Sequence, residues 1–352
     1  MEISESFAVF QRLQYGDLHI HSDLASGLIA IIAIHSTKLG PALGGCRYIE
    51  YGTFDEAVVD ALRLAKAMSF KSAITDLPFG GGKAVIIKSY PMPEREHFFQ
   101  AFGKFVHSLQ GQYITAEDSG TTVADMDIIK TVTPFVTGIN DPNFSFADPS
   151  ILTAIGIRYG MQAAVKFALK RDNLEGLHVA IQGVGKVGYQ LVKELIKHGV
   201  KITVSDLNAK NITKCQEEFK VEITAPEHIH KIACDIFAPC ALSNAIHPGN
   251  LNEIQAKIIA GSANNQLKTP DLADVLMNKG ILYAPDYVIN AGGLIHAATQ
   301  YLHEKEQSAL EKAKKIENTL TLLFERSITE QISPLEIANR IARERLLVTR
   351  TS

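Results

Sequence analysis

The first half of the chain switches repeatedly between two spacings of apolar residues. Residues 27–36 (GLIAIIAIHS) and 83–88 (KAVIIK) are short, nearly continuous apolar runs, which are typical of buried strands. Residues 54–73 and 94–110 instead carry apolar side chains at helical spacing, and residues 113–118 (YITAED) are again strand-like. This alternation predicts an α/β fold in which strands and helices follow one another along the chain.

A polar loop separates this region from the rest of the chain. Residues 138–150 (GINDPNFSFADPS) are rich in Pro, Asp, Asn and Ser, and a long helical pattern with proline at its start follows. Strand and helix patterns then alternate regularly, and residues 335–347 form an amphipathic tail. We therefore expect two domains, in keeping with a length of 352 residues. The predicted boundaries are 1–145 for the first domain, 146–332 for the second, and 333–352 for a tail that packs back onto the first.

The composition is that of a globular protein with a large core. Apolar residues make up 46% of the chain and charged residues 21%, and the net charge of −3 argues against nucleic acid or an anionic membrane as a partner. No apolar stretch near the N-terminus approaches the roughly 20 residues that span a bilayer, and we see no signal peptide. The four cysteines lack CxxC spacing, and we interpret His19 and His21 as side chains on an edge strand and not as metal ligands. We expect a reduced, cytoplasmic protein without a metal site.

The most specific local signal lies in residues 177–206 (LHVAIQGVGKVGYQLVKELIKHGVKITVSD). A predicted strand ends at Gly183, a helical pattern surrounds Gly188, and a second predicted strand ends at Asp206. In a dinucleotide-binding turn the first glycine allows the tight turn, the second (here Gly185) lets the backbone approach a pyrophosphate, and the third lets helix and strand pack closely. A carboxylate at Asp206 accepts hydrogen bonds from the adenosine ribose and repels a 2′-phosphate, which favours NAD over NADP as the cofactor. The predicted cofactor loop comprises Gly183, Val184, Gly185, Lys186, Val187 and Gly188.

A second glycine-rich stretch, residues 77–87 (LPFGGGKAVII), differs from a simple turn. A turn needs one glycine and rarely three, so we interpret these glycines as backbone cleared for a small substrate. Lys71 and Lys83 flank them and offer ammonium groups to a carboxylate or carbonyl oxygen, and partial burial can lower the pKa of a lysine enough for it to exchange protons near neutral pH. Residues 43–47 (LGGCR) add a second glycine pair, and Asp118, just past a predicted strand, adds a carboxylate that could shuttle protons. Taken singly, each feature also fits a solvated lysine, a plain turn or a capping residue.

Seven strings of residues occur in the order found in one enzyme family. They are LGPALGGCRY, DALRLAKAMSFKSA, FGGGKAVII, YITAEDSGTTVADMDII, DIFAPCAL, IIAGSANNQL and YAPDYVINAGGLI. The chain therefore resembles the glutamate/leucine/phenylalanine/valine dehydrogenases over about residues 27–302, and it is most similar to the leucine dehydrogenases among them.

The resemblance implies a fold, a reaction and an assembly. The fold would be a two-domain α/β structure with an N-terminal α/β domain for substrate binding, catalysis and oligomerisation, a Rossmann-type NAD-binding domain, and an active-site cleft between them. The reaction would convert an L-amino acid, water and NAD reversibly to a 2-oxo acid, ammonium and NADH, as in branched-chain amino acid catabolism. A homo-oligomer, either an octamer or a dimer, is implied as well.

By the same resemblance, three charged residues carry the chemistry. Lys71 holds the α-carboxylate of the substrate, and Lys83 activates water and stabilises the developing carbinolamine. Asp118 moves protons to and from the substrate nitrogen. The further implied site residues are Gly44 and Gly45, whose backbone lines the site, and Thr153, Asn264 and Asn290, which place the nicotinamide and the substrate.

The resemblance also bears on the side chain of the substrate. Glutamate-specific members carry lysine where this chain has Leu43 and serine at the position of Ala297, so glutamate would bury an unpartnered carboxylate here and be a very poor substrate. The inferred pocket of Leu43, Ala116, Leu294 and Ala297 suits leucine, and also valine or isoleucine. Leucine-active relatives often carry valine at the last two positions, so an enzyme for phenylalanine or another aromatic amino acid is the alternative. A second alternative is a catalytically silent regulator that binds NAD or an amino acid, although the intact charged set argues against it.

Overall fold

The computed structural model describes residues 8–9, 16–88, 94–142, 144, 148–241 and 243–347. The chain forms two compact units. The first unit comprises Met1–Ala147, His296–Glu306 and Ala342–Ser352, and the second comprises Asp148–Ile295 and Gln307–Ile341. The assignment of a substrate role to the first part of the chain and an NAD role to the second stays a prediction at this point.

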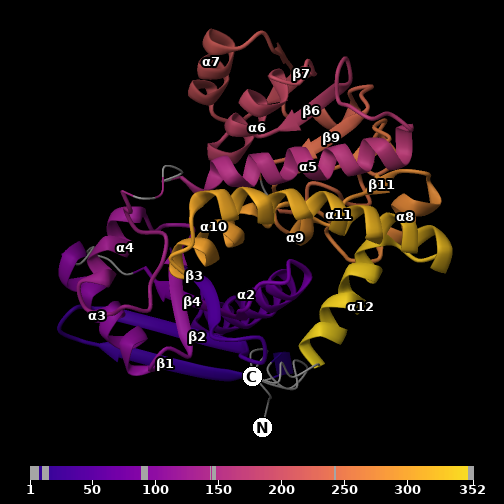
Figure 1. Ribbon diagram of the computed structural model, residues 1–352. Coiled ribbons are helices and arrows are strands. Elements are labelled where there is room, and N and C mark those ends of the chain that lie inside the picture. The colour runs from indigo at the N-terminus through magenta and orange to yellow at the C-terminus, as the bar shows by residue number, and fades with distance from the viewer. Residues whose placement is uncertain are drawn as a thin grey trace. The chain divides into compact units, whose positions relative to one another are not determined.

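A mixed five-stranded sheet lies at the centre of the first unit (Figure 1). Its strand order is β1-β2-β4-β3-β5, in which β2 runs antiparallel to β1 and β4, and β3 runs parallel to β4 and β5. The helices and strands predicted for this region are confirmed, except that β4 begins at Gly80 and so includes the glycines expected to precede it. The elements are β1 (Asp17–Asp23), β2 (Leu28–Ser36), β3 (Ala42–Ile49), α2 (Phe54–Ile74), β4 (Gly80–Ile87), α3 (Arg95–Ser108), β5 (Tyr113–Glu117) and α4 (Val123–Lys130).

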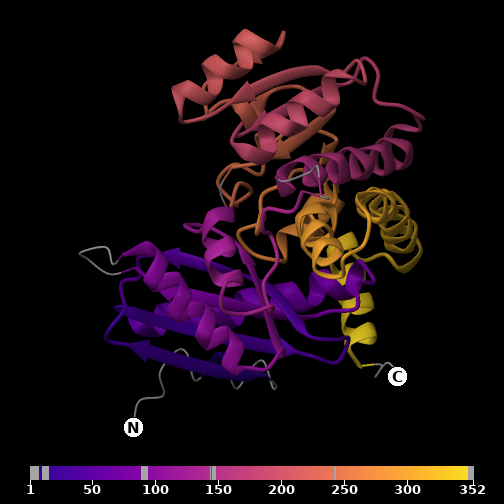
Figure 2. The ribbon, with the colours of Figure 1, turned by 60° about the vertical axis from the view of Figure 1, so that its left-hand side comes forward.

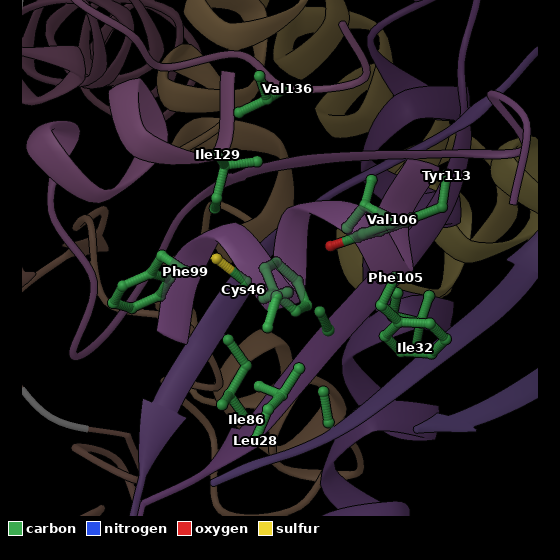
Figure 3. Packing of buried hydrophobic residues seen from close by; sticks show 14 of the residues in the cluster. Leu28, Ile32, Cys46, Ile86, Phe99, Phe105, Val106, Tyr113, Ile129 and Val136 are labelled. Atoms are coloured by element: carbon green, nitrogen blue, oxygen red, sulfur yellow. The ribbon is translucent and has the colours of Figure 1, made fainter. Parts of the chain in front are cut away.

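Alternate residues of the central strands pack on opposite faces of this sheet. On one face, Ile32 of β2 packs in a cluster with Phe99 of α3 and Ile129 of α4 (Figure 3). On the other face, the neighbouring Ile31 packs in a cluster with Leu62 of α2. Truncating a fully buried phenylalanine such as Phe99 to alanine lowers the free energy of unfolding by about 3–5 kcal/mol. The sheet is therefore held between α2 on one face and α3 with α4 on the other.

The second unit contains a six-stranded parallel sheet with the order β11-β10-β9-β6-β7-β8. Its first strand in sequence, β6, lies in the middle, so the strand order reverses beside it, and ligands of such sheets bind at the carboxyl ends of the strands at this reversal. Figure 2 shows α6 packed against these strands. The elements are α5 (Pro149–Leu169), β6 (His178–Gln182), α6 (Lys186–Ile196), β7 (Lys201–Ser205), α7 (Ala209–Glu218), β8 (Glu222–Ile223), a 3-10 turn (Ile229–Lys231), β9 (Ile236–Pro239), β10 (Ile258–Ile259), α8 (Leu272–Asn278), β11 (Leu282–Tyr283) and α9 (Asp286–Ile289).

Three helices complete the chain. They are α10 (Gly292–Tyr301), α11 (Glu306–Glu330) and α12 (Pro334–Leu347). Within the first unit, Gln300 of α10 accepts a hydrogen bond from the Gly138 N–H (2.6 Å) and donates to the Ile139 carbonyl (2.9 Å). Arg345 of α12 donates to the Ala73 carbonyl (2.7 Å) at the end of α2, where a cation interacts favourably with the helix dipole. Among the helices of the described residues, none combines the length and the apolar character that crossing a membrane requires.

Candidate active site and dinucleotide pocket

Lys83 and Arg47 project from neighbouring strands toward α2. Lys83 lies two residues before Val85 on β4, and Val85 packs against α2, so the pleat directs both side chains to that face. Arg47 of β3 precedes Tyr48, which packs on the opposite face, and the Arg47 Nη1 lies 2.8 Å from Oδ2 of Asp60 in α2. The face of the sheet that α2 covers therefore carries charged side chains from two strands.

Lys83 is a buried amine with a carboxylate partner. Its side chain is 6% exposed and its Nζ contacts Oδ2 of Asp118 in an ion pair. The pKa of Lys83 is lowered to about 7, chiefly by burial and secondarily by the positive charges of Arg47 and Lys71. An amine with this pKa accepts and donates protons near neutral pH, as a general acid–base catalyst must.

A tight turn after β5 holds Asp118 in place. The Asp118 Oδ1 accepts a hydrogen bond from the Ser119 N–H (2.5 Å), and the Asp118 N–H donates to Oγ1 of Thr121 (2.9 Å). The Thr121 hydroxyl in turn donates to the Cys46 carbonyl (3.0 Å), which ties the turn to β3. Gly120 has a φ of 85°, and a β-carbon there would lie 1.9 Å from a backbone oxygen of β3, so only glycine fits this close approach.

The glycines before Lys83 are required by the packing of the protein itself. A β-carbon on Gly80 would lie 1.8 Å from the last carbonyl oxygen of β2, and one on Gly81 would lie 2.0 Å from the backbone nitrogen of Ser69 in α2. One on Gly82 would lie 2.8 Å from the ring of Tyr113. The interpretation of these three glycines as backbone cleared for a substrate is therefore wrong, because α2 and neighbouring residues already fill that space.

The second glycine pair lies beside the turn that carries Asp118. Leu43, Gly44 and Gly45 belong to β3, and Gly45 pairs with Ala116 of β5. A β-carbon on Gly45 would lie 2.8 Å from the Asp118 Cβ, whereas Leu43 is completely buried. The structure thus brings this pair next to the predicted catalytic carboxylate.

The remaining predicted substrate residues lie on helices. Lys71 lies in the last turn of α2, close enough for its charge to lower the pKa of Lys83. Ala297 of α10 groups with the first unit, where its carbonyl accepts a hydrogen bond from the Thr137 hydroxyl (2.8 Å). Leu294 of the same helix groups with the second unit and is buried.

The three glycines of the predicted cofactor loop have three different environments. Gly183 has a φ of 93°, and a β-carbon there would lie 2.5 Å from the Ala241 Cβ, while one on Gly188 would lie 2.0 Å from the Gly183 carbonyl oxygen. A β-carbon on Gly185 would meet no atom within 4 Å among the described residues, its two chain neighbours aside. Gly185 also caps α6 without a side-chain acceptor, so open space lies at a helix N-terminus, where anions bind favourably. The other loop residues are Val184, before the cap, and Lys186 and Val187, in the first turn of α6.

A cavity of about 620 Å³ lies at the carboxyl ends of β6 and β7. Asp206 lines it, and its carboxylate accepts hydrogen bonds from the N–H groups of Val184 (2.8 Å) and Asn208 (2.7 Å). Gln182 and Ser205 also line it, and their buried Oε1 and Oγ atoms have no hydrogen-bond partner among the described residues. This cavity fits a dinucleotide for three reasons. It has open space at the helix cap, a carboxylate that can accept further hydrogen bonds, and two buried polar atoms without a partner among the described residues.

The three remaining cofactor candidates lie near one another in the second unit. Asn290 donates through Nδ2 to Oδ1 of Asn264 (2.8 Å) and to the Ser262 carbonyl (3.0 Å). A β-carbon on Gly293 would lie 3.3 Å from Oγ1 of Thr153, so this hydroxyl lies beside the start of α10. The structure thus joins Asn264 and Asn290 directly and places Thr153 close to the segment that follows Asn290.

Sequence reasoning missed four polar residues at these sites. Asp60 interrupts a buried stretch of α2 between Val59 and Ala61, which is a signal that a charged partner lies opposite. Arg47, that partner, follows the LGGC string directly, and Gln182 and Ser205 end the two strands of the cofactor motif. Within the described ranges, no group of three or more His, Cys, Asp or Glu side chains is arranged to hold a metal ion.

Comparison with known proteins gives matches along nearly the whole chain. Residues 17–134 match the description "Glu/Leu/Phe/Val dehydrogenase, dimerisation domain", and residues 206–346 match "Glutamate/Leucine/Phenylalanine/Valine dehydrogenase". The leucine dehydrogenase of Geobacillus stearothermophilus is 45% identical over 342 residues, which are 97% of this chain and 93% of that protein. The phenylalanine dehydrogenase of Bacillus thermotolerans is 39% identical over 98% of this chain and 92% of its own.

A solved structure supports the same assignment. The crystal structure of L-tryptophan dehydrogenase from Nostoc punctiforme matches with a TM-score of 0.84 and 35% identity, covering 98% of this chain and 100% of that chain. Three findings support one family. They are the two family matches, the long alignments at these identities and the two-unit α/β fold. The chain belongs to the glutamate/leucine/phenylalanine/valine dehydrogenase family.

Proposed function

We propose that the protein catalyses the reversible, NAD-dependent oxidative deamination of branched-chain L-amino acids, with leucine as substrate and valine and isoleucine as further substrates. The observation that carries this proposal is the buried ion pair of Lys83 with Asp118, in which the pKa of the lysine is lowered to about 7. Family membership and 45% identity to a leucine dehydrogenase support the reaction and the substrate class.

Three side chains of the first unit have distinct roles in the proposed mechanism. Lys71 binds the α-carboxylate of the substrate. Once the amino acid has been oxidised to an imine, the neutral amine of Lys83 takes a proton from the water that attacks its carbon, and the resulting ammonium stabilises the carbinolamine. Asp118 moves protons to and from the substrate nitrogen, which leaves as ammonia. NAD, when bound, supplies the acceptor for the hydride of the α-carbon.

The proposed NAD site is the cavity of the second unit. The open space over Gly185 would hold the phosphates, and Asp206 would accept hydrogen bonds from the adenosine ribose. The Asp206 carboxylate faces this cavity and would repel a 2′-phosphate, which supports NAD over NADP. Steady-state kinetics with both cofactors test this preference, and equal kcat/KM values would contradict it.

The proposed substrate preference depends on apolar residues. Leu43 and Ala297 offer no charge to a γ-carboxylate, and burying a carboxylate without a partner costs several kcal/mol, so glutamate is expected to be a very poor substrate. The small side chain of Ala297 favours one second candidate, an enzyme for phenylalanine or another aromatic amino acid.

The experiment that tests the proposal is NADH oxidation in the presence of ammonium with four 2-oxo acids at equal concentration. Fast oxidation with 4-methyl-2-oxopentanoate and 3-methyl-2-oxobutanoate, and none with 2-oxoglutarate, is the expected result. A clear preference for phenylpyruvate would replace the substrate assignment with the aromatic one. Absence of turnover with all four from protein that binds NADH would favour a silent regulator.

Two variants connect the activity to the residues. Lys83→Ala removes the proposed base, and we expect loss of turnover with retained NADH binding and an unchanged circular dichroism spectrum. Because deamination needs the neutral amine, wild-type kcat/KM should rise with pH through about pH 7, the pKa of Lys83. Unchanged turnover in Lys83→Ala would refute the mechanism. The matched control for Lys83→Ala is Lys220→Ala, which removes a lysine just before β8 in the second unit.

Assembly and location are also part of the proposal. A homo-oligomer, either an octamer or a dimer, is supported by the description of the family domain that matches residues 17–134. Static light scattering measures its size, and a monomer at micromolar concentration would contradict it. The four free cysteines support a reducing compartment, the cytoplasm.

A further inference from the structure

Four charged groups of alternating sign form an array in the first unit. The array begins with the ion pair of Lys83 and Asp118. On the other side of this carboxylate, the Arg47 Nε lies 3.9 Å from the Asp118 Oδ1. The Arg47 Nη1 lies 2.8 Å from Oδ2 of Asp60, and this same Oδ2 accepts a hydrogen bond from the Tyr51 hydroxyl (2.6 Å). Asp60 and Tyr51 therefore hold the outer edge of the Arg47 guanidinium.

The inner edge of the guanidinium is unusual. The Arg47 Nε atom is buried and has no hydrogen-bond partner among the described residues, although its side chain is 23% exposed as a whole. A buried donor left unpaired costs about 1–3 kcal/mol, so an arginine with a purely structural role would be expected to satisfy it. Here the unpaired N–H faces the oxygen of Asp118 that does not contact Lys83.

We propose that Arg47, held by Asp60 and Tyr51, is a positioning residue that keeps the Asp118 carboxylate against Lys83 and sets the balance of charge around that lysine. The inference rests on the proposed function, because it takes Lys83 and Asp118 as the pair that transfers protons. Arg47 and Asp60 act through that pair.

The charges around Lys83 determine the sign of the expected effects. The titratable groups whose charge acts on it are Arg47 and Cys46 of β3 and Lys71 and Asp60 of α2, and Asp118 from the turn after β5 contacts it directly. Burial raises the pKa of the Cys46 thiol to about 11, so it is neutral near pH 7. The charge of Arg47 lowers the pKa of Lys83 and the charge of Asp60 raises it. Removing the arginine should therefore raise the pKa of Lys83, and removing the aspartate should lower it.

The test is the pH dependence of kcat/KM for L-leucine deamination, measured from about pH 5.5 to about pH 9. Activity needs the neutral amine, so the acid limb of the profile follows the pKa of Lys83. We expect Arg47→Gln to move this limb to higher pH and Asp60→Asn to move it to lower pH, each by more than the error of the fitted pKa. A defect of folding or packing lowers activity, but it does not move the limb in opposite directions for these two substitutions.

Three controls separate charge from geometry. Arg47→Lys keeps the charge but lacks the planar fork, so the limb should stay near its wild-type position while kcat falls several-fold. Tyr51→Phe removes the hydrogen bond to Asp60 without changing any charge, and its limb should not move. Arg63→Gln removes the same charge as Arg47→Gln from an exposed position on α2, and both its limb and its kcat/KM should match wild type.

Each outcome has a definite meaning. Limbs that shift in opposite directions support the inference, whereas limbs that stay in place or shift together overturn it. If Arg47→Gln does not fold, Asp60→Asn decides alone, because an unmoved limb in that variant overturns the inference. A wild-type profile without a limb near neutral pH, or Lys83→Ala with full turnover, would instead refute the proposed function itself.

Discussion

Replacing Gly185 by alanine should separate cofactor binding from stability. A β-carbon at Gly185 would meet nothing within 4 Å in the part of the chain that the structure describes, apart from its own chain neighbours, and the residue has a φ of −68°, which alanine adopts readily. At Gly188, only three residues away, a β-carbon would lie 2.0 Å from the Gly183 carbonyl oxygen. Both substitutions add a methyl group to the same loop. In Gly185→Ala it enters open space, whereas in Gly188→Ala it meets backbone.

The structure gives the size of each effect. The stability of Gly185→Ala should stay within about 1 kcal/mol of wild type. Its methyl group would lie where we propose that the pyrophosphate binds, so NADH binding should weaken about 10-fold to 100-fold, or roughly 1.4–2.8 kcal/mol. Gly188→Ala overpacks a contact with backbone and should lose about 1–3 kcal/mol of stability. At about 2–4 °C per kcal/mol, its Tm should fall by roughly 2–12 °C.

The assay is favoured by the composition of the chain. The protein has no tryptophan, so NADH fluorescence can be titrated without tryptophan emission, and far-UV circular dichroism follows thermal unfolding of the apoprotein. Wild-type affinity for NADH in Gly185→Ala would show that the phosphates do not lie at this turn. An unchanged Tm in Gly188→Ala would refute the close approach of α6 to the loop.

Three further substitutions test other contacts. Gly81→Ala should lower stability by about 1–3 kcal/mol, because its β-carbon would lie 2.0 Å from the backbone of Ser69; a wild-type melting curve would contradict this. Asp125→Asn weakens the paired contacts with Arg95 (2.6 and 2.7 Å) at a buried carboxylate and should lower the free energy of unfolding by about 1–3 kcal/mol, measured with urea. Thr121→Val removes the hydroxyl that ties the turn after β5 to β3, so kcat should fall about 10-fold with an unchanged KM for NAD; an unchanged kcat would exclude this positioning role.

Prediction of structure from the sequence was most accurate where all parts of a feature are contiguous in the chain. Residues 177–206 contain a strand, a turn, a helix and a second strand, and the structure contains each of them, with the Asp206 carboxylate accepting a hydrogen bond from the Val184 N–H of the loop. The strands and helices of the first unit could likewise be read from apolar spacing, because that spacing reflects which side of each element is buried. The resemblance to the family rests on the same kind of local string.

The glycines at 80–82 show where this reasoning failed. In the sequence, three consecutive glycines before Lys83 look like the glycines of the cofactor loop, and both stretches suggest backbone open to a ligand. Only the packed structure separates them, because Gly81 faces the backbone of α2 whereas Gly185 faces open space. A glycine in the sequence does not reveal why a side chain is absent. The reason depends on whether protein atoms or open space lie where the β-carbon would be.

The order of elements, the predicted cofactor motif and the charged residues proposed for catalysis can be read along the chain. The tertiary structure decided which of those residues meet. Arg47, Asp60, Lys83 and Asp118 come from β3, α2, β4 and the turn after β5, and their pairing follows from sheet order and from the face that α2 covers. The pKa of Lys83 likewise depends on burial by segments distant in the chain. Local backbone conformation is set by neighbours along the sequence, whereas burial and charge interactions are set by neighbours in space.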